Sequence, residues 1–133
     1  MIEVSCAIII KDSKILAVQH GPGSSHPWKW EFPGGKIHTD ETAVQCVIRE
    51  IEEELMLRIE VLSELECIEF DYGIKQIRLI PFVCRITSGE LFLTEHVDKC
   101  WFDPNKCQAI DWLGADRELI LKNQESIEAG IKI

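Results

Sequence analysis

Several features that mark particular classes of protein are missing from this sequence of 133 residues. It contains no uninterrupted apolar run of about 18 residues, the length at which a membrane-spanning helix is expected. The apolar stretch over residues 4–10 has no basic flank before it, which predicts a buried strand and not a signal peptide. Basic residues are scarce, 14 against 23 acidic ones, and the formal net charge is -9. This imbalance argues against a nucleic-acid polymer or a membrane surface as partner, because both present many phosphates.

The six cysteines lack the spacing of a metal or redox motif. No C-x-x-C pair occurs, and His96, Cys100 and Cys107 do not form a recognised zinc pattern with a fourth ligand. Four of the cysteines lie inside apolar segments, where a free cysteine behaves as a small hydrophobic residue. We therefore expect a reduced, cytoplasmic chain.

What remains is the composition of an ordinary globular domain, with 46% hydrophobic and 28% charged residues. The length predicts one domain over residues 1–133. The expected elements are strands over residues 2–10, 15–19, 59–72 and 74–87, a loop over 21–27, a short helix from Pro104 and a final helix over 116–129. This order predicts an α/β fold in which a mixed sheet lies between helices.

Residues 40–55 combine an apolar stripe with a cluster of acids. Apolar residues recur there at steps of three and four, which predicts an amphipathic helix capped by Thr39 or Asp40. The carboxylates that share one face of this helix are Glu50, Glu53 and Glu54. Like charges at this spacing repel unless a cation neutralises them, and Mg²⁺ prefers such oxygen ligands. A solvated acidic helix face is the alternative.

The surroundings of the acidic helix favour the metal interpretation. Gly34 and Gly35 precede it, and such a compact pair lets backbone carbonyls approach a cation. Arg49 can form a fork to a neighbouring carboxylate. Glu41 lies nine residues before Glu50 and would be out of phase with it on one continuous helix. Glu41 can therefore join the cluster only from the preceding loop.

These residues resemble a known motif, the Nudix box, written G-x5-E-x7-R-E-U-x-E-E-x-G-U with U for an aliphatic residue. The matching positions, within residues 35–57, are Gly35, Glu41, Arg49-Glu50-Ile51, Glu53-Glu54 and Leu57. Met56 stands in place of the second glycine, where a helix commonly ends in the left-handed conformation. Methionine removes no ligand, but it costs about 1–2 kcal/mol if that conformation is kept.

The segment Trp30–Ile37, with the sequence WEFPGGKI, is similar to the MutT branch of the Nudix hydrolases. The resemblance implies a mixed sheet between helices, with the box forming a loop, a helix and a loop. It also implies that water attacks an internal phosphorus of a nucleoside or deoxynucleoside triphosphate, giving the monophosphate and pyrophosphate. Substrates with oxidised or modified bases are included, as in sanitation of the nucleotide pool and DNA repair. The implied cofactor is Mg²⁺, with Mn²⁺ as a substitute.

The resemblance further implies roles for individual residues. The implied metal ligands are Gly34 through its carbonyl, Glu50, Glu53, Glu54 and Glu95. Either Glu50 or Glu53 could instead deprotonate the attacking water. Arg49 and Glu41 correspond to orienting residues. Glu95 falls in a loop where such enzymes place one more carboxylate, although a solvent-exposed acid would look the same in the sequence.

The candidate substrate-binding residues are His20, Phe32, Lys36, Tyr72 and Asp116. Phe32 corresponds to the position that packs the base, and Lys36 could meet a phosphate. An ionised Asp116 only accepts hydrogen bonds and so favours cytosine, whose N4 is a donor, but it could equally cap the last helix. His20 stands where a MutT enzyme specialised for oxidised guanine has arginine, which counts against a simple 8-oxo-dGTP assignment.

Three alternative functions stay open: a pyrophosphohydrolase that prefers CTP or modified dCTP, a nucleoside-diphosphate-sugar hydrolase, and a non-catalytic nucleotide-binding module. The intact carboxylates and Arg49 favour an enzyme, because a binding module has little reason to keep repelling charges. About 30 residues precede the WEFPGGKI segment, which leaves little room for the extra N-terminal strands of the sugar hydrolases. The sequence predicts no oligomeric state.

Overall fold

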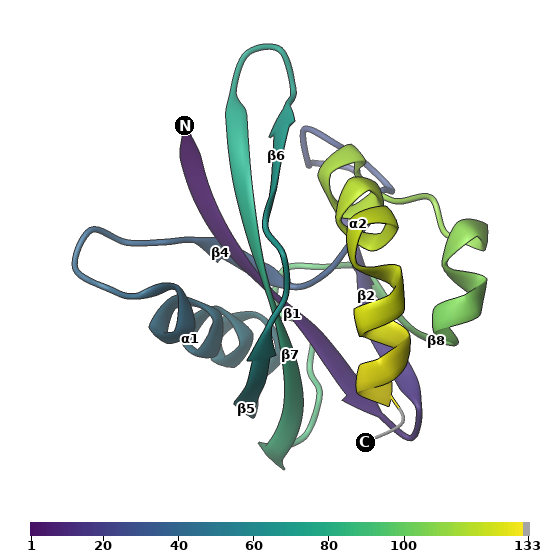
Figure 1. Ribbon diagram of the computed structural model, residues 1–133. Coiled ribbons are helices and arrows are strands. Elements are labelled where there is room, and N and C mark those ends of the chain that lie inside the picture. Colours follow the sequence, from purple (N-terminus) through teal and green to yellow (C-terminus); the bar gives the residue numbers. More distant parts are fainter. Residues whose placement is uncertain (132–133) are drawn as a thin grey trace.

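The computed structural model describes residues 1–131 and shows one mixed β-sheet with a long helix on each face (Figure 1). The strands are β1 (Ile2–Lys11), β2 (Lys14–Gln19), β3 (Trp30–Glu31), β4 (Gly34–Lys36), β5 (Leu57–Glu64), β6 (Ile68–Asp71), β7 (Gln76–Gly89) and β8 (Asp98–Phe102). The helices are α1 (Ala43–Leu55), the short 3₁₀ helix η1 (Pro104–Ala109) and α2 (Gly114–Ile131). Over residues 1–131, no helix is both long enough and apolar enough to cross a membrane.

The sheet has eight strands, and its main path runs β3-β2-β1-β7-β5. Off this path, β4 pairs with β1, β6 with β7, and β8 with β2. The β1–β7 pair is parallel, whereas the other strand pairs are antiparallel. The predicted α/β class with a mixed sheet between helices is therefore confirmed.

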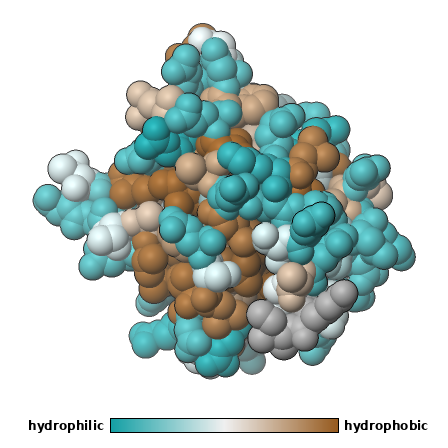
Figure 2. Space-filling view, in the orientation of Figure 1, coloured by the Kyte–Doolittle hydropathy of each residue, from teal (hydrophilic) through white to brown (hydrophobic). Residues whose placement is uncertain are grey.

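The apolar run in β1 is buried on both faces because each face is covered by a helix. Cys6 and Ile8 pack into the core that includes α2, and Ala7 and Ile9 pack into the core that includes α1. A strand covered on both sides reads as a continuous apolar run, without alternation. Figure 2 shows hydrophobic side chains gathered near the centre of this view, with hydrophilic side chains around them.

The start of α1 differs from the prediction, since the helix is capped by Thr42 and not by Thr39 or Asp40. The Thr42 hydroxyl accepts a hydrogen bond from the Gln45 N–H, and the Gln45 side chain accepts one from the Thr42 N–H. This reciprocal capping box satisfies two free amides at once, which a cap one turn earlier would not do. The residues before Thr42 consequently stay in a loop.

The strand predicted over residues 59–72 is split into β5 and β6. Between them, the buried Asn123 of α2 bonds the backbone of Glu66 twice, accepting from its N–H and donating to its carbonyl, each at 2.9 Å. A side chain distant in sequence thus replaces the ladder bonds of the sheet at this point, which local strand propensity cannot reveal.

Met56 ends α1 in the left-handed conformation, with φ 57° and ψ 32°. Its N–H donates to the Glu52 carbonyl at 3.0 Å, so the closing turn of the box is kept despite the missing glycine. The side chain is 57% exposed and contributes little packing to lose.

We expect Met56→Gly to raise the free energy of unfolding by about 1 kcal/mol. Relief of the left-handed strain is offset in part by the greater freedom of glycine in the unfolded chain. Urea denaturation measures the change, with Met56→Ala as the control that removes the side chain but keeps Cβ. Equal stability of the two variants would contradict the strain argument.

Candidate active site

The loop that leads into α1 is fastened to the helix by Glu41 and Arg49. The Glu41 carboxylate accepts from Arg49 Nε at 2.9 Å and from Nη2 at 2.6 Å. This fork is the main cause that lowers the pKa of Glu41 to about 2. Because Thr42 caps the helix, Glu41 lies outside it and reaches Arg49 from the loop.

Arg49 also binds the acidic face of the helix. Its Nη1 donates to Glu50 at 2.9 Å and to Glu53 at 3.2 Å, and Nη2 donates to the Lys36 carbonyl at 3.3 Å. One guanidinium therefore joins the loop, the end of β4 and two carboxylates of α1. This arrangement partly compensates the repulsion between the two acids.

Glycine is required at positions 34 and 35 of β4 because neighbouring atoms leave no room for a Cβ, and not because of an unusual φ. A Cβ on Gly35 would overlap the carboxylate of Glu50, and a Cβ on Gly34 would overlap the backbone of Ser5 in β1. The two glycines therefore let the acidic helix press against the sheet.

Glu54 is the buried acid of the cluster, with 5% of its surface exposed. Its Oε2 accepts from the Gly34 N–H at 3.3 Å. Burial, together with the charges of Glu31, Glu50 and Glu95, raises the pKa of Glu54 to about 9. Burial is also the main cause of the raised pKa of Glu50, to which Glu53 and Glu95 add. The negative charge of each of these carboxylates disfavours ionisation of the others.

This donor set fits a hard divalent cation. The side-chain atoms around Glu54 that could bind a metal are carboxylate oxygens. Arg49 pairs with Glu50 and Glu53 but makes no hydrogen bond or ion pair with Glu54 or Glu95 among residues 1–131. A cation beside these carboxylates would offset both the burial and the repulsion. Hard cations of this kind take carboxylate and carbonyl oxygens as ligands.

The loop after β7 reaches the cluster because it caps the end of α1. The Thr94 hydroxyl donates to the carbonyls of Glu53 and Glu54, and its N–H donates to the latter. Two of the free carbonyls at the helix end are thereby satisfied. Because Thr94 is bonded there, the next residues, Glu95 and His96, lie near the acidic end of α1.

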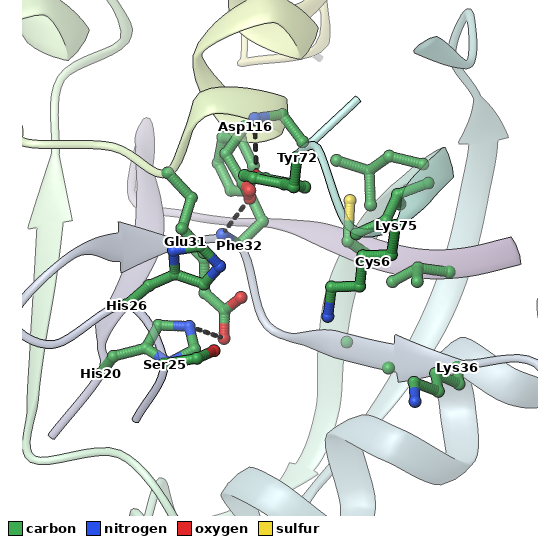
Figure 3. Close-up of a pocket in the computed structure, with 17 residues that line it drawn as sticks. Cys6, His20, Ser25, His26, Glu31, Phe32, Lys36, Tyr72, Lys75 and Asp116 are labelled. Carbon is green, nitrogen blue, oxygen red and sulfur yellow. Dashed lines mark hydrogen bonds and ion pairs between the residues drawn. The ribbon is translucent and has the colours of Figure 1, made fainter. Parts of the chain in front are cut away.

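A cavity of about 200 Å³ opens beside β4 (Figure 3). All five side chains predicted to contact substrate line it, together with both glycines of β4. The five are His20, Phe32, Lys36, Tyr72 and Asp116. Gly35 thus adjoins the Glu50 carboxylate on one side and the cavity on the other. Trp28 is largely exposed and is not among the lining residues.

Asp116 is not the N-cap of the last helix. It lies within the first turn of α2, and its Oδ2 accepts from the Phe32 N–H at 2.9 Å. Burial and then the charge of Glu31 raise the pKa of Asp116 well above its ordinary value, which favours the neutral acid. An ionised Asp116, as predicted from the sequence, would only accept hydrogen bonds, whereas the neutral acid both donates and accepts them.

Phe32 is a core residue as much as a pocket residue. It is 2% exposed, and its ring centroid lies 4.8 Å from that of Trp112. The ring is therefore a fixed part of the cavity wall, held by core packing.

Two residues of the site were missed from the sequence. Glu31 lies between His20 and His96, and His96 had been considered only with Cys100 and Cys107. The sequence does offer a signal for Glu31, because it is an acid between two aromatic residues, Trp30 and Phe32, in a short strand. No local signal marked His96, because its contact with Glu31 spans 65 positions in the chain.

Comparisons with known proteins agree with this geometry. Residues 1–123 match the NUDIX domain family. The chain is 32% identical to the CTP pyrophosphohydrolase of Escherichia coli (strain K12) over 120 residues, covering 90% of this chain and 89% of the relative. It is 27% identical to the 8-oxo-dGTP diphosphatase of the same strain over 122 residues, covering 91% and 95%.

Among solved structures, the chain resembles the mismatch repair protein MutT, a Nudix hydrolase, from methicillin-resistant Staphylococcus aureus 252. The TM-score is 0.74 at 34% identity, and the match covers 96% of this chain and 95% of that one. With the family match over residues 1–123, these likenesses extend well beyond the box. The chain belongs to the Nudix domain family and is a hydrolase of the MutT-like kind.

Proposed function

We propose that this enzyme hydrolyses a nucleoside triphosphate to the monophosphate and pyrophosphate with Mg²⁺, for which Mn²⁺ can substitute. The observation that carries this proposal is the double role of β4, whose Gly35 adjoins Glu50 on one side and the cavity on the other. A nucleoside in the cavity would have its phosphates beside the carboxylates. The relatives named for CTP and 8-oxo-dGTP support the same substrate class.

Glu50, Glu54, Glu95 and the Gly34 carbonyl would hold the metal. When bound, the metal supplies Lewis acidity and lowers the pKa of a coordinated water. Glu53 is the exposed acid of the three on α1, with 58% of its side chain accessible, and its hydrogen bond is to Arg49. We propose that the Glu53 carboxylate accepts the proton of the attacking water. Arg49 and Glu41 orient these acids, and Lys36 faces the phosphates.

We place cytidine triphosphates first among the substrates. One oxygen of Asp116 is occupied by the Phe32 N–H, which leaves its other oxygen for the base. In the neutral acid that oxygen accepts from an amino group such as cytosine N4 and donates to a ring nitrogen. Oxidised guanine triphosphates are the second candidate, favoured by the relatives that act on them.

With Mg²⁺ present, the enzyme should release pyrophosphate from at least one member of a panel of ordinary, oxidised and methylated triphosphates. Glu53→Gln should lower kcat on that substrate by at least about 100-fold, because it removes the proton acceptor. Glu52→Gln, on an exposed position of the same helix, is the matched control. No turnover across the whole panel, or equal losses in the two variants, would overturn the proposal.

Gly35→Ala should reduce kcat by about 100-fold, because its Cβ would displace the Glu50 carboxylate. Gly23→Ala is the control, since a Cβ there meets no atom within 4 Å. Steady-state kinetics with parallel thermal melts separates a misplaced carboxylate from a loss of fold. Full activity of a well-folded Gly35→Ala protein would contradict the close packing described above.

Asp116→Asn should lower kcat/KM for cytidine triphosphates by about 10- to 100-fold. The amide oxygen must accept from the Phe32 N–H, so only the NH₂ group is left for the base, and it cannot accept from cytosine N4. Asp111→Asn, at an exposed position paired with Lys29, is the control. Unchanged cytidine turnover would remove Asp116 from base recognition.

A further inference from the structure

Three side chains from different parts of the chain converge beside the cavity: His20 and Glu31 line it (Figure 3), and His96 lies against Glu31. His20 follows β2, Glu31 ends β3, and His96 lies in the loop before β8. His20 Nε2 is 3.0 Å from Glu31 Oε2, and His96 Nε2 is 2.9 Å from the same oxygen. One potential ligand atom from each of the three side chains lies within 4.8 Å of the other two.

The backbone and a neighbouring hydroxyl hold both imidazoles in place. Ser24 Oγ lies 2.7 Å from His20 Nδ1 and is itself fixed by the His26 N–H, which donates to it at 3.0 Å. The Val97 N–H donates to the Gln19 carbonyl at 3.0 Å, which ties the His96 loop to the end of β2. The two rings meet edge to face, at 79°, so their Nε2 atoms can approach one point.

Two imidazole nitrogens of this cluster are left without hydrogen bonds. His20 Nε2 is buried and, although close to Glu31, makes no well-directed hydrogen bond within residues 1–131. His96 Nδ1 is likewise buried and unpartnered within that range, but it is Nε2 of this ring that lies beside Glu31, so the unpartnered nitrogen that a ligand inside the cluster could satisfy is that of His20. Native proteins pair nearly all such buried nitrogens, so an exception calls for a ligand or a function.

We propose that His20, Glu31 and His96 form a second metal site, separate from the carboxylates of α1 and selective for a borderline cation such as Zn²⁺. Two imidazoles and one carboxylate are an established donor set for zinc, whereas Mg²⁺ prefers oxygen ligands throughout. Bonds of about 2.0–2.2 Å place tetrahedral ligands about 3.3 Å apart. The present separations require only a small adjustment.

The surroundings supply the features that such sites share. Ser24 holds the second nitrogen of His20, as outer partners of zinc-bound histidines do. His20 and Glu31 line the cavity, so the fourth position would face water or a bound molecule.

Cobalt(II) tests the proposal without relying on activity, because four-coordinate sites with imidazole ligands give strong visible absorption and octahedral oxygen sites do not. Metal-free protein is first saturated with Mg²⁺ and then titrated with Co²⁺. We expect one equivalent of Co²⁺ to give the strong visible bands, Zn²⁺ to abolish them, and Mg²⁺ to leave them unchanged. Thiolate bands in the near ultraviolet would instead report binding to cysteine.

Substitutions of individual residues show which side chains bind Co²⁺. His96→Gln and Glu31→Gln should each weaken Co²⁺ binding by at least about 100-fold, and Ser24→Ala by about 10-fold, in line with loss of an outer partner. Glu53→Gln, on the acidic face of α1, should leave the cobalt spectrum unchanged. His20→Gln, at a more accessible position, serves if His96→Gln fails to fold by circular dichroism.

The proposal is overturned if Co²⁺ gives only weak octahedral bands, if Mg²⁺ removes the signal, or if thiolate bands dominate. It is also overturned if the histidine variants bind Co²⁺ as the parent protein does. The cluster would then be a hydrogen-bonded clamp in which the two imidazoles hold Glu31 at the cavity wall. Loss of the cobalt site in a protein that still hydrolyses triphosphates, or the converse, separates this inference from the proposed function.

Discussion

Negative charge concentrated in the last two turns of α1 is the constraint on which the rest of the site depends. Two carboxylates about 4 Å apart repel by about 4 kcal/mol at an effective dielectric constant of 20, and the C-terminal end of a helix is itself partly negative. Arg49 offsets part of this repulsion through its bonds to Glu50 and Glu53. It can do so from a fixed position because Glu41 holds the other edge of the guanidinium. On the side of Glu54, whose pKa is raised mainly by burial, a bound cation would favour the ionised carboxylate and offset the remaining repulsion.

The packing around that charge explains why small residues and strained turns occur where they do. Gly35 has no room for a side chain because the Glu50 carboxylate occupies the space, and Gly34 lies as close to β1. At the other end of the helix, the chain must reverse at once into β5, and Met56 accepts a left-handed conformation to do so. The closing turn is therefore kept by tertiary packing even where the residue disfavours it.

The loop over residues 90–97 joins the end of α1 to the end of β2. Thr94 caps α1, and the Val97 N–H donates to the Gln19 carbonyl at the end of β2, so the two residues between them are held between these elements. One consequence is that Glu95 joins the carboxylates of α1 while His96 joins Glu31. Oxygen donors and imidazole donors thus lie side by side in separate groups, which is the basis for assigning them different cations.

The sequence by itself determined the fold class, the order of the main elements and the acidic face of α1, because each depends on periodicity or on short, fixed spacing. The family resemblance also indicated five of the side chains that line the cavity. Only the tertiary structure decided the cap at Thr42, the break between β5 and β6, and the bond from Asp116 to Phe32. It alone decided that Asp116 is buried enough to favour its neutral form and that His96 meets Glu31. These features depend on contacts between residues far apart in the chain and on burial, and neither quantity is expressed in local pattern.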